Sequence, residues 1–476
     1  MLRTYPLYSG LFALLVSFSI FCCAPAQAQT LINPYEGIDW SLINQYKASL
    51  HTHTTESDGM LPPEEVIDAY ASLDYDILSL TDHRRISYPW QNWGRDPEDV
   101  GLFDIPGCEF SNHNHLNGYF VNHTSNFHSL EESLAEIEEQ GGLAHINHPG
   151  EYWKLNKQKL VPDEVIRKYV NWFTAFSPDL LLGMEVINHV NLYPQDEQLW
   201  DALLSVMMPE RPIWGFANDD MHYPYVGLTR LIAVSWEMFL LESLDESQIR
   251  NAMLNGQYYF SAHGTVLNSM EWDVNKVPVI TEIVHDETAG TLSIHAMSDG
   301  ADLPDADYVW ISMGEVVHYG PVLDYKNTEG IGNYVRARLE GAAGTTFTNP
   351  FGLIRDDGRL VVYVSPADAI YSGAEWKLEG TDIWYKHGDA IQLDPGEYTI
   401  VFNRIDSYHS PDPVTVTVTA NKTTLVTTSD GAEYVYDPSL KLPVSTPTTV
   451  TLLVMLLTAV ALFYFRAPRA KTKDLF

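Results

Sequence analysis

The chain has 476 residues, of which 45% are hydrophobic, and its 63 acidic residues outnumber 28 basic ones. Its length exceeds that of one ordinary domain, and its apolar content is sufficient to build hydrophobic cores. A formal net charge of −35 excludes general binding to nucleic acid through the phosphates, so no nucleic-acid partner is expected.

Residues 1–28 have the features of a signal peptide. Arg3 gives a weakly positive start, residues 11–21 are apolar, and residues 26–28 read Ala-Gln-Ala, a small-x-small cleavage site. The mature chain is therefore expected to begin near Gln29 and to be exported.

Residues 40–265 alternate between short apolar strands and helical patterns. The expected strands lie around residues 46–52, 75–83, 104–110, 115–122, 142–150, 181–188 and 212–222. The expected helices lie around residues 62–73, 129–140, 163–170, 196–208 and 245–256. Repeated strand–helix units predict a parallel sheet, and about seven of them favour a closed (β/α)7 barrel over an open sheet.

After residue 265 the pattern changes to alternating strands and turns rich in Gly, Asp and Pro. Residues 266–356 and 357–436 are each expected to form a small β-sandwich. The predicted fold class is therefore α/β, with a barrel followed by two small β-sandwich domains. Residues 437–449, rich in Pro, Ser and Thr, are expected to be a linker.

Residues 450–465 are apolar and uncharged, and the tail at 466–476 is basic. This arrangement is typical of a C-terminal transmembrane segment whose basic side lies in the cytoplasm. Sixteen residues at about 1.5 Å each span about 24 Å, so the flanking threonines must enter the bilayer or the bilayer must thin. A sorting tail that is later removed is the alternative. In both cases the bulk of the chain is expected at the cytoplasmic membrane, facing the periplasm or the cell exterior.

Residue types that bind metals follow several expected strands at their carboxyl ends, where barrels of this kind hold their chemistry. Two pairs, His51 with His53 and Asp220 with His222, are spaced so that both members point to one face of a strand. Chance placement of so many imidazoles and carboxylates at one barrel end is a poor explanation. The candidates at strand ends are His51, His53, His83, Glu109, His148, Asp220 and His222.

Six short motifs follow one another along residues 47–265. They are HTHTTESDG at 51–59, TDH at 81–83, PGCE at 106–109, HLNGYF at 115–120, NHPG at 147–150 and DDMH at 219–222. In this order they resemble the PHP (polymerase and histidinol phosphatase) domain. The resemblance implies a distorted (β/α)7 barrel that holds two or three divalent metal ions and hydrolyses its substrate.

The resemblance also implies which residues bind the ions. One ion would lie on His51, His53, Glu109 and Asp220, a second on Glu109, His115 and His148, and a third on Asp58, His83 and His222. Glu109, His53 and Asp220 would be catalytic through a metal-bound hydroxide. Imidazole and carboxylate ligands without thiolate suit Zn²⁺, Mn²⁺ or Fe.

Other histidines in the region are weaker candidates. His113, on the same strand face, and the nearby His123 are alternatives to His115. Cys108, the single cysteine left after the signal, should point away from Glu109 and be buried. Hydrogen-bonded core positions are expected for His145, His189 and His263.

A phosphoester is the favoured substrate, either a small molecule or an oligomer. Divalent ions that are offset by three carboxylates would make the pocket locally positive, and metal-bound water with a pKa near about 7 can attack phosphorus. Arg84 could add a phosphate contact, although an exposed surface role is equally open. The same hydroxide can attack a carbonyl, so hydrolysis of an ester, amide or carbamate is the alternative. A second alternative is a surface-attached binding protein with an inactive barrel.

Overall fold

The structure is a computed structural model. It describes residues 30–125, 129–153, 161–189, 191–226, 229–264 and 273–440. The expected signal peptide at 1–28, the greater part of the linker and the segments 450–465 and 466–476 lie outside these ranges. Within the described ranges, no helix is long and apolar enough to cross a membrane.

The chain divides into two compact units. The first extends to Val362 and also includes Gly388–Tyr398 and Thr415–Val426. The second contains Tyr363–His387, Thr399–Val414 and the residues from Thr427 onward. The predicted boundary at residue 357 therefore differs from the division into compact units, because the first unit keeps three strands of the C-terminal region.

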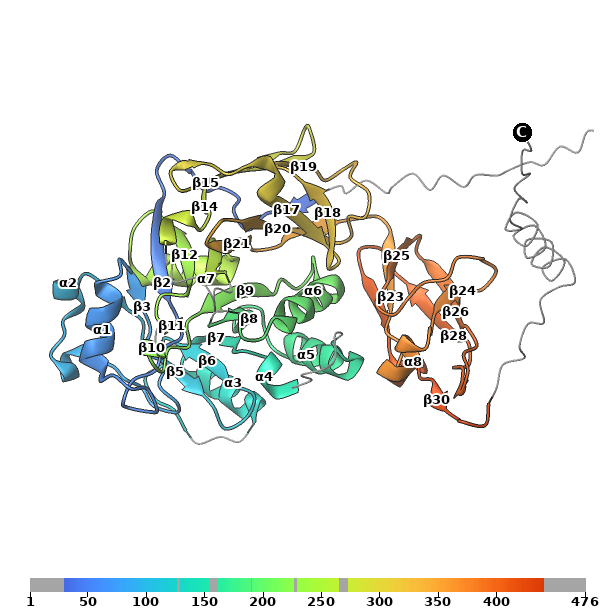
Figure 1. Cartoon of the computed structure of the whole chain (residues 1–476), viewed down its shortest axis with the longest axis horizontal. Coiled ribbons are helices and arrows are strands. Elements are labelled where there is room, and N and C mark those ends of the chain that lie inside the picture. The colour runs from blue at the N-terminus through green and yellow to red at the C-terminus, as the bar shows by residue number, and fades with distance from the viewer. Residues whose placement is uncertain are drawn as a thin grey trace, which may run out of the picture. The chain divides into compact units, whose positions relative to one another are not determined.

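A five-stranded sheet carries one half of the candidate site (Figure 1). Its order is β5 (Gly107–Phe110), β6 (Leu116–Tyr119), β7 (Leu143–Ile146), β8 (Leu181–Asn188) and β9 (Trp214–Asn218). The strands β7, β8 and β9 are parallel, as predicted, but β6 is antiparallel to both of its neighbours. Only residues 111–115 separate β5 from β6, which permits a hairpin, whereas a parallel crossover needs about a dozen residues or more.

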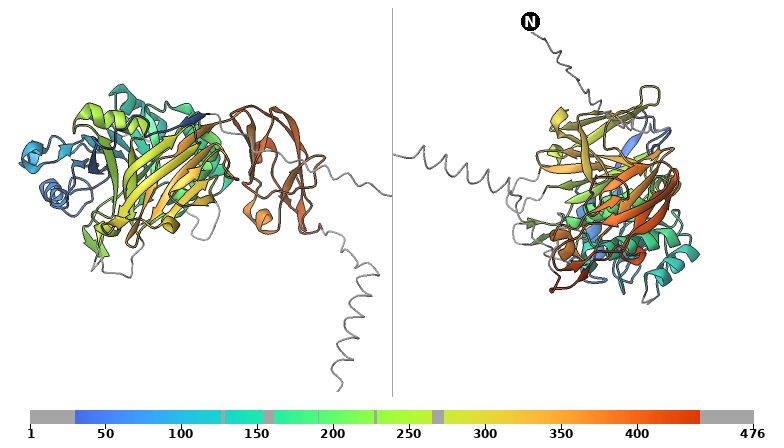
Figure 2. Two further views of the ribbon diagram at one scale, coloured as in Figure 1. Left: turned by 90° about the horizontal axis from the view of Figure 1, so that it is seen from above. Right: turned by 90° about the vertical axis from the view of Figure 1, so that its right-hand side faces the viewer.

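An eleven-stranded sheet carries the other half of the site (Figure 2). Its strands are β1 (Thr30–Ile32), β2 (Asn44–Ser49), β3 (Ile77–Leu78), β4 (Phe103–Asp104), β12 (Ser235–Leu241), β13 (Tyr258–His263), β17 (Tyr308–Ser312), β18 (Glu315–Tyr319), β20 (Tyr334–Glu340), β21 (Gly344–Thr348) and β22 (Phe351–Ile354). The strands β13 and β21 pair from Tyr259↔Thr348 to His263↔Gly344. Strands expected for a separate sandwich at 266–356 therefore extend the sheet of the N-terminal region.

The two sheets meet at two isolated bridges, which we call the seam. Thr52 pairs with Met221, and His83 pairs with Glu109. Since single bridges replace a continuous ladder, the described strands form no closed barrel, and the prediction of a (β/α)7 barrel was wrong in this respect. Polar side chains, in place of a neighbouring strand, bond to backbone groups where the two sheets meet: the Leu50 N–H, after β2, donates to Oδ1 of Asn218 in β9 at 3.0 Å.

The five predicted helices of residues 40–265 form to within a few residues of their expected bounds, except that the helix from Asp163 continues to Ala175. The one-turn helices at Pro97–Val100 and Gly150–Trp153 were not predicted. Ser129 caps its helix by accepting from the Glu132 N–H at 3.1 Å. The α-helices of the described residues are α1 (Pro63–Ala71), α2 (Pro97–Val100), α3 (Leu130–Glu139), α4 (Gly150–Trp153), α5 (Asp163–Ala175), α6 (Gln195–Met207), α7 (Glu246–Asn255) and α8 (Ala367–Tyr371). Short 3₁₀ turns are η1 (Trp90–Trp93), η2 (Val274–Lys276), η3 (Asp305–Asp307) and η4 (Thr428–Asp430).

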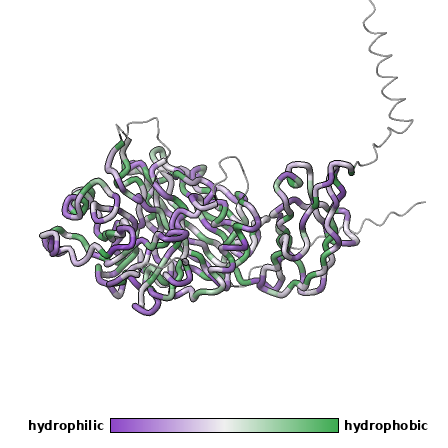
Figure 3. Tube along the Cα trace, turned by 90° about the horizontal axis from the view of Figure 1, so that it is seen from below, coloured by the Kyte–Doolittle hydropathy of each residue, from purple (hydrophilic) through white to green (hydrophobic). Residues whose placement is uncertain are grey.

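A smaller sheet contributes to a second core in the first unit. It consists of β14 (Val279–Asp286), β15 (Thr291–Ser298), β16 (Ala301–Asp302) and β19 (Val322–Asp324). Alternate residues of β15, among them Leu292 and Ile294, are buried in one cluster with Trp310 of β17. Figure 3 shows that hydrophilic and hydrophobic residues are interspersed along the chain as a whole. Burial of one face explains why these strands follow a period of two.

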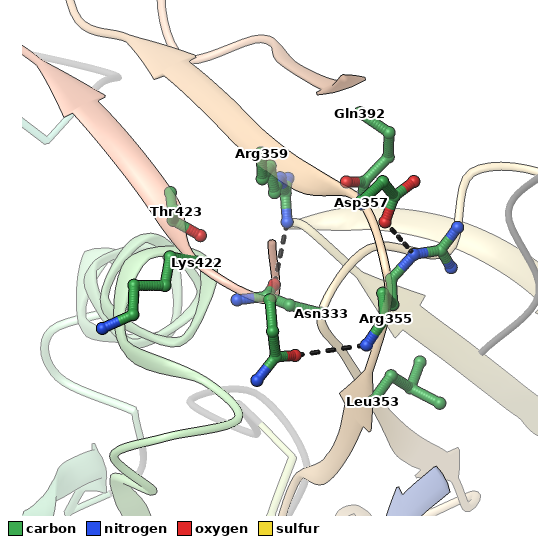
Figure 4. A pocket seen from close by; sticks show the side chains of 9 residues that line it. Asn333, Leu353, Arg355, Asp357, Arg359, Gln392, Lys422 and Thr423 are labelled. Carbon is green, nitrogen blue, oxygen red and sulfur yellow. Dashed lines mark hydrogen bonds and ion pairs between the residues drawn. The ribbon is translucent and has the colours of Figure 1, made fainter. Parts of the chain in front are cut away.

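Three further strands of the first unit are β23 (Gly358–Val362), β25 (Ala390–Leu393) and β29 (Thr423–Val426). Beside them lies a small pocket that contains two arginines (Figure 4). Arg359 donates to Asn333 Oδ1 at 2.8 Å, and Arg355 Nε lies 2.9 Å from Asp357 Oδ1. These contacts hold the start of β23.

The second unit contains α8 and short strands. They are β24 (Trp376–Leu378), β27 (Tyr408–His409), β30 (Val435–Tyr436) and parts of β26 (Gly396–Phe402) and β28 (Val414–Val418). The indole of Trp376 is fully buried and packs 4.8 Å from the Tyr385 ring. A core role therefore accounts for this tryptophan.

One buried ion pair links α6 to β20. The Arg336 guanidinium is fully buried, with Nη2 lying 2.6 Å from Asp201 Oδ2 and 2.8 Å from Glu197 Oε1. Tyr334 also donates to Asp201 at 2.7 Å. These charges raise the pKa of Arg336 despite the opposing effect of burial.

We expect Arg336→Met to lower the free energy of unfolding by about 3–5 kcal/mol, because it leaves two acidic groups without their buried partner. The matched control is Arg338→Met, since Arg338 contacts Glu197 and Glu340 at the surface and should contribute about 1 kcal/mol or less. Urea-induced unfolding measures both values. Equal losses in the two variants would contradict the structural role of Arg336.

Candidate metal centre

The nine predicted ligands come from separate elements but converge at one end of the two sheets. His51, His53 and Asp58 follow β2, His83 follows β3, Glu109 lies in β5, His148 follows β7, and Asp220 and His222 follow β9. His115 directly precedes β6, which runs in the opposite direction, so its amino end lies at the same edge of the sheet. All nine side chains therefore meet at the seam.

Glu109 is the centre of this cluster. Its carboxylate is fully buried, and His83 Nδ1 approaches it at 2.6 Å and His115 Nδ1 at 3.0 Å. Three more imidazoles surround it at 3.3 to 3.6 Å, namely His51, His53 and His148. A carboxylate in this position can contact more than one ion.

Asp220 occupies a similar position at the other edge of the five-stranded sheet, after β9. Its Oδ1 lies 3.0 Å from His53 Nε2 and 3.3 Å from His51 Nε2. The two imidazole nitrogens are 3.1 Å apart. The predicted set of His51, His53, Glu109 and Asp220 is thus close enough to surround one ion.

Asp58, His83 and His222 form a more exposed group. The two Asp58 oxygens lie 3.4 Å from His83 Nε2 and 3.3 Å from His222 Nε2. A turn at Gly59 positions the aspartate, and a Cβ added to Gly59 would lie 2.6 Å from the His53 backbone carbonyl. The close approach of the chain to itself therefore requires glycine after Asp58.

The arrangement of the donor atoms suits the binding of divalent cations better than hydrogen bonding between the donors themselves. Although Glu109 Oε2, Asp220 Oδ1, His83 Nδ1 and His115 Nδ1 are buried at short mutual distances, none makes a hydrogen bond of acceptable geometry within the described residues. Such buried groups normally have partners. Atoms that converge on shared points without hydrogen-bonding to one another are what a metal site requires.

The charges of the cluster are mutually dependent. Burial alone would raise the pKa of Glu109, but the rings of His51, His115 and His148 outweigh it and hold that pKa well below its usual range. Burial also disfavours the charged form of His51, yet Asp220, Glu185 and Glu109 raise its pKa well above the ordinary value. Ions bound among these groups would take over the role of the imidazolium charges.

A buried carboxylate outside the predicted set supports the ligands. Glu185 of β8 lies with Oε1 2.7 Å from His51 Nδ1, and its Oε2 accepts from the His148 N–H at 2.9 Å. The Asn188 amide donates to the same Oε2 at 3.1 Å. This contact leaves His51 Nε2 facing Glu109 and Asp220, as is typical of carboxylate–histidine pairs in metal sites.

Sequence reasoning missed three neighbours of the site. Glu185 lies within an apolar strand, Glu151 Oε2 lies 3.1 Å from His148 Nδ1, and His189 Nε2 lies 3.6 Å from Asp220 Oδ2. The expectation that His189 is a core histidine was therefore wrong, whereas His145 is buried against Phe216, as expected. The only available signal was position, since His189 directly follows β8 and Glu151 lies in α4, which begins four residues after β7.

The remaining predicted residues have the following surroundings. Cys108 is fully buried, as expected. Arg84 is exposed, and its Nη1 donates to Asn112 at 2.6 Å, so the guanidinium lies at the surface near the site. His113 Nε2 lies 2.8 Å from the Ser133 hydroxyl, and His123 lies near Glu136, so neither faces Glu109.

Comparison with known proteins gives only distant likenesses. No protein-family model and no curated protein matches the chain. A two-domain protein from Bacteroides vulgatus that contains a predicted PHP-like metal-dependent phosphoesterase is 19% identical, with a TM-score of 0.37, over 69% of this chain and 91% of that chain. An amidohydrolase from Chromobacterium violaceum is 17% identical, with a TM-score of 0.29, over 37% of this chain and 88% of that chain. A protein from Bifidobacterium adolescentis, assigned as a metal-dependent phosphoesterase, is 13% identical, with a TM-score of 0.30, over 44% of this chain and 96% of that chain.

We expect Glu109→Ala to lose most of the bound metal, because this carboxylate faces five imidazoles, whereas Asp58→Ala should lose only the ion of the exposed group. Metal analysis of the full chain after chelation and reloading with Zn²⁺ or Mn²⁺ measures the stoichiometry. Glu242→Ala, at an exposed position after β12, is the control. Full metal content in Glu109→Ala would contradict the arrangement.

We expect Glu185→Gln to weaken metal binding about 10–100-fold, because the amide cannot replace the charged acceptor at His51 Nδ1. Competition with a chromogenic chelator measures the affinity. Glu237→Gln is a suitable control, since Glu237 is equally buried but accepts from the Ala217 N–H at 3.0 Å and contacts none of the nine residues. An equal loss in both variants would indicate a general packing effect instead.

Proposed function

We propose that the protein is a metal-dependent hydrolase of the PHP type and that it acts on phosphoesters. The observation that carries the proposal is the convergence of six imidazoles and three carboxylates, with Glu109 at the centre and Glu185 behind His51. Two or three divalent ions, of Zn, Mn or Fe, are the cofactors proposed for these donors. Bound there, they would supply Lewis acidity and lower the pKa of water.

The reaction proposed is hydrolysis of a P–O bond. The oxygen of water forms a bond to phosphorus, the bond from phosphorus to the leaving alkoxide oxygen breaks, and that oxygen receives a proton that water has lost. The protein's own contribution is positioning. Buried Glu109 and Asp220 fix the donors on the two sheet edges, and the imidazoles of the more exposed group hold Asp58 in place.

Charge makes a phosphoester suitable for this site. The protein as a whole is acidic, but only three carboxylates belong to the nine proposed ligands. A pocket with divalent ions would be locally positive and would bind an anionic group that the rest of the surface repels. Arg84 directly follows His83 in the chain, and its guanidinium would add a positive charge at the surface beside the site.

The location of the activity is also a proposal. The apolar segments at 1–28 and 450–465 support export and attachment to the cytoplasmic membrane, with the site outside the cytoplasm. Attachment would restrict the enzyme to substrates that reach the membrane surface.

A substrate panel tests the reaction class. We expect the full chain loaded with Mn²⁺ or Zn²⁺ to hydrolyse p-nitrophenyl phosphate or a bis-phosphodiester, and to lose this activity on chelation and in His53→Ala. An aryl ester and an aryl carbamate complete the panel. Faster turnover of the ester or carbamate would replace the phosphoesterase proposal by the acyl-hydrolase alternative, and binding without any turnover would favour the inactive-barrel alternative.

A further inference from the structure

Exposed apolar side chains of residues 44–263 are concentrated beside the candidate metal centre. Within the described part of that range, six large apolar residues are 38% to 59% exposed. Five of them lie in the segments after β2, β8 and β9, and the sixth, Tyr88, follows β3 and lies toward Asp104. We call these five the apolar rim: Met60, Leu192, Tyr223, Tyr225 and Val226.

The apolar rim is attached to the proposed ligands by short contacts. The Met60 N–H donates to the His222 carbonyl at 2.8 Å, which places the segment after Asp58 beside the segment after β9. The Tyr223 ring stacks on the His222 ring, with a centroid distance of 6.5 Å. The rim therefore begins where the metal-ligand cluster reaches the surface.

A short hairpin holds one side of the rim in place. Tyr225 and Val226 form β10 (Tyr225–Val226), which pairs with β11 (Thr229–Arg230), and the Leu231 N–H donates to the Pro224 carbonyl at 2.9 Å. Leu192 lies on the other side, next to Tyr193, whose ring is 6.2 Å from that of His148. The segments that carry these apolar residues thus adjoin the cluster at two places, His222 and His148.

Single exposed hydrophobic residues are normal, whereas exposed hydrophobic residues grouped beside one site are typical of surfaces that bind a ligand or a partner. We propose that the substrate is a phosphoester that carries an apolar alkyl or aryl group, with the phosphate at the metal centre and the apolar group on the rim. This inference rests on the proposed function. The rim is continuous with the ligand cluster, which favours a substrate group over a separate partner as its occupant.

A series of n-alkyl phosphates from ethyl to octyl, used below their micelle concentrations with the metal-loaded full chain, tests the inference. We expect kcat/KM to rise about two- to fourfold for each added CH₂, as apolar surface leaves water. The double variant Tyr223→Ser/Tyr225→Ser should flatten this rise, mainly through KM, and should keep its metal. Val226→Ser is a second, smaller variant that should flatten it in part.

Tyr319→Ser is the matched control, because Tyr319 is equally exposed but lies in β18. It should keep the full dependence on chain length. Turnover without chain-length dependence, or a dependence that the rim variants leave unchanged, would overturn this inference alone. Absence of turnover with every phosphoester would instead overturn the proposed function.

Discussion

A fully buried carboxylate with five imidazoles around it is the feature on which the rest of the structure depends. Removing so many ionisable groups from water is costly unless they share compensating charges. The fold meets this constraint because its strands end at one place, so that Glu109 faces imidazoles from the segments after β2, β3 and β7 and from the segment before β6. Glu185 adds a second layer by orienting His51. Cations bound among these donors would remove the remaining electrostatic cost.

Much of this arrangement could be predicted from the sequence because it depends on local patterns. The helices at 129–140 and 245–256 have polar caps and an apolar stripe, and both form where the pattern places them. The His51–His53 spacing requires one strand face whatever the topology. Motif order then predicted that distant segments would meet, and the structure brings all nine side chains together.

The rest depended on interactions between distant segments. The strand β12, with the sequence SWEMFLL, was not predicted, although it pairs with both β2 and β13 and so determines how the sheet continues. A closed barrel was expected because the strand count suits one, but the short connection before β6 makes that strand antiparallel, and single bridges replace the ladder at the seam. Glu185 could not be recognised because a single acid in an apolar strand has no spacing pattern.

The seam has a consequence for stability. Within the described residues Cys108 is a buried free thiol, so no disulfide joins the two sheets. Ions held by His51 and Asp58, which follow β2 of the eleven-stranded sheet, and by Glu109 and Asp220 of the five-stranded sheet would be cross-links across an otherwise weakly bridged junction. The folding equilibrium would then include the metal concentration, since binding to the native state alone stabilises it by mass action. Metal supply would thereby govern how long the folded chain persists, in addition to what it can hydrolyse.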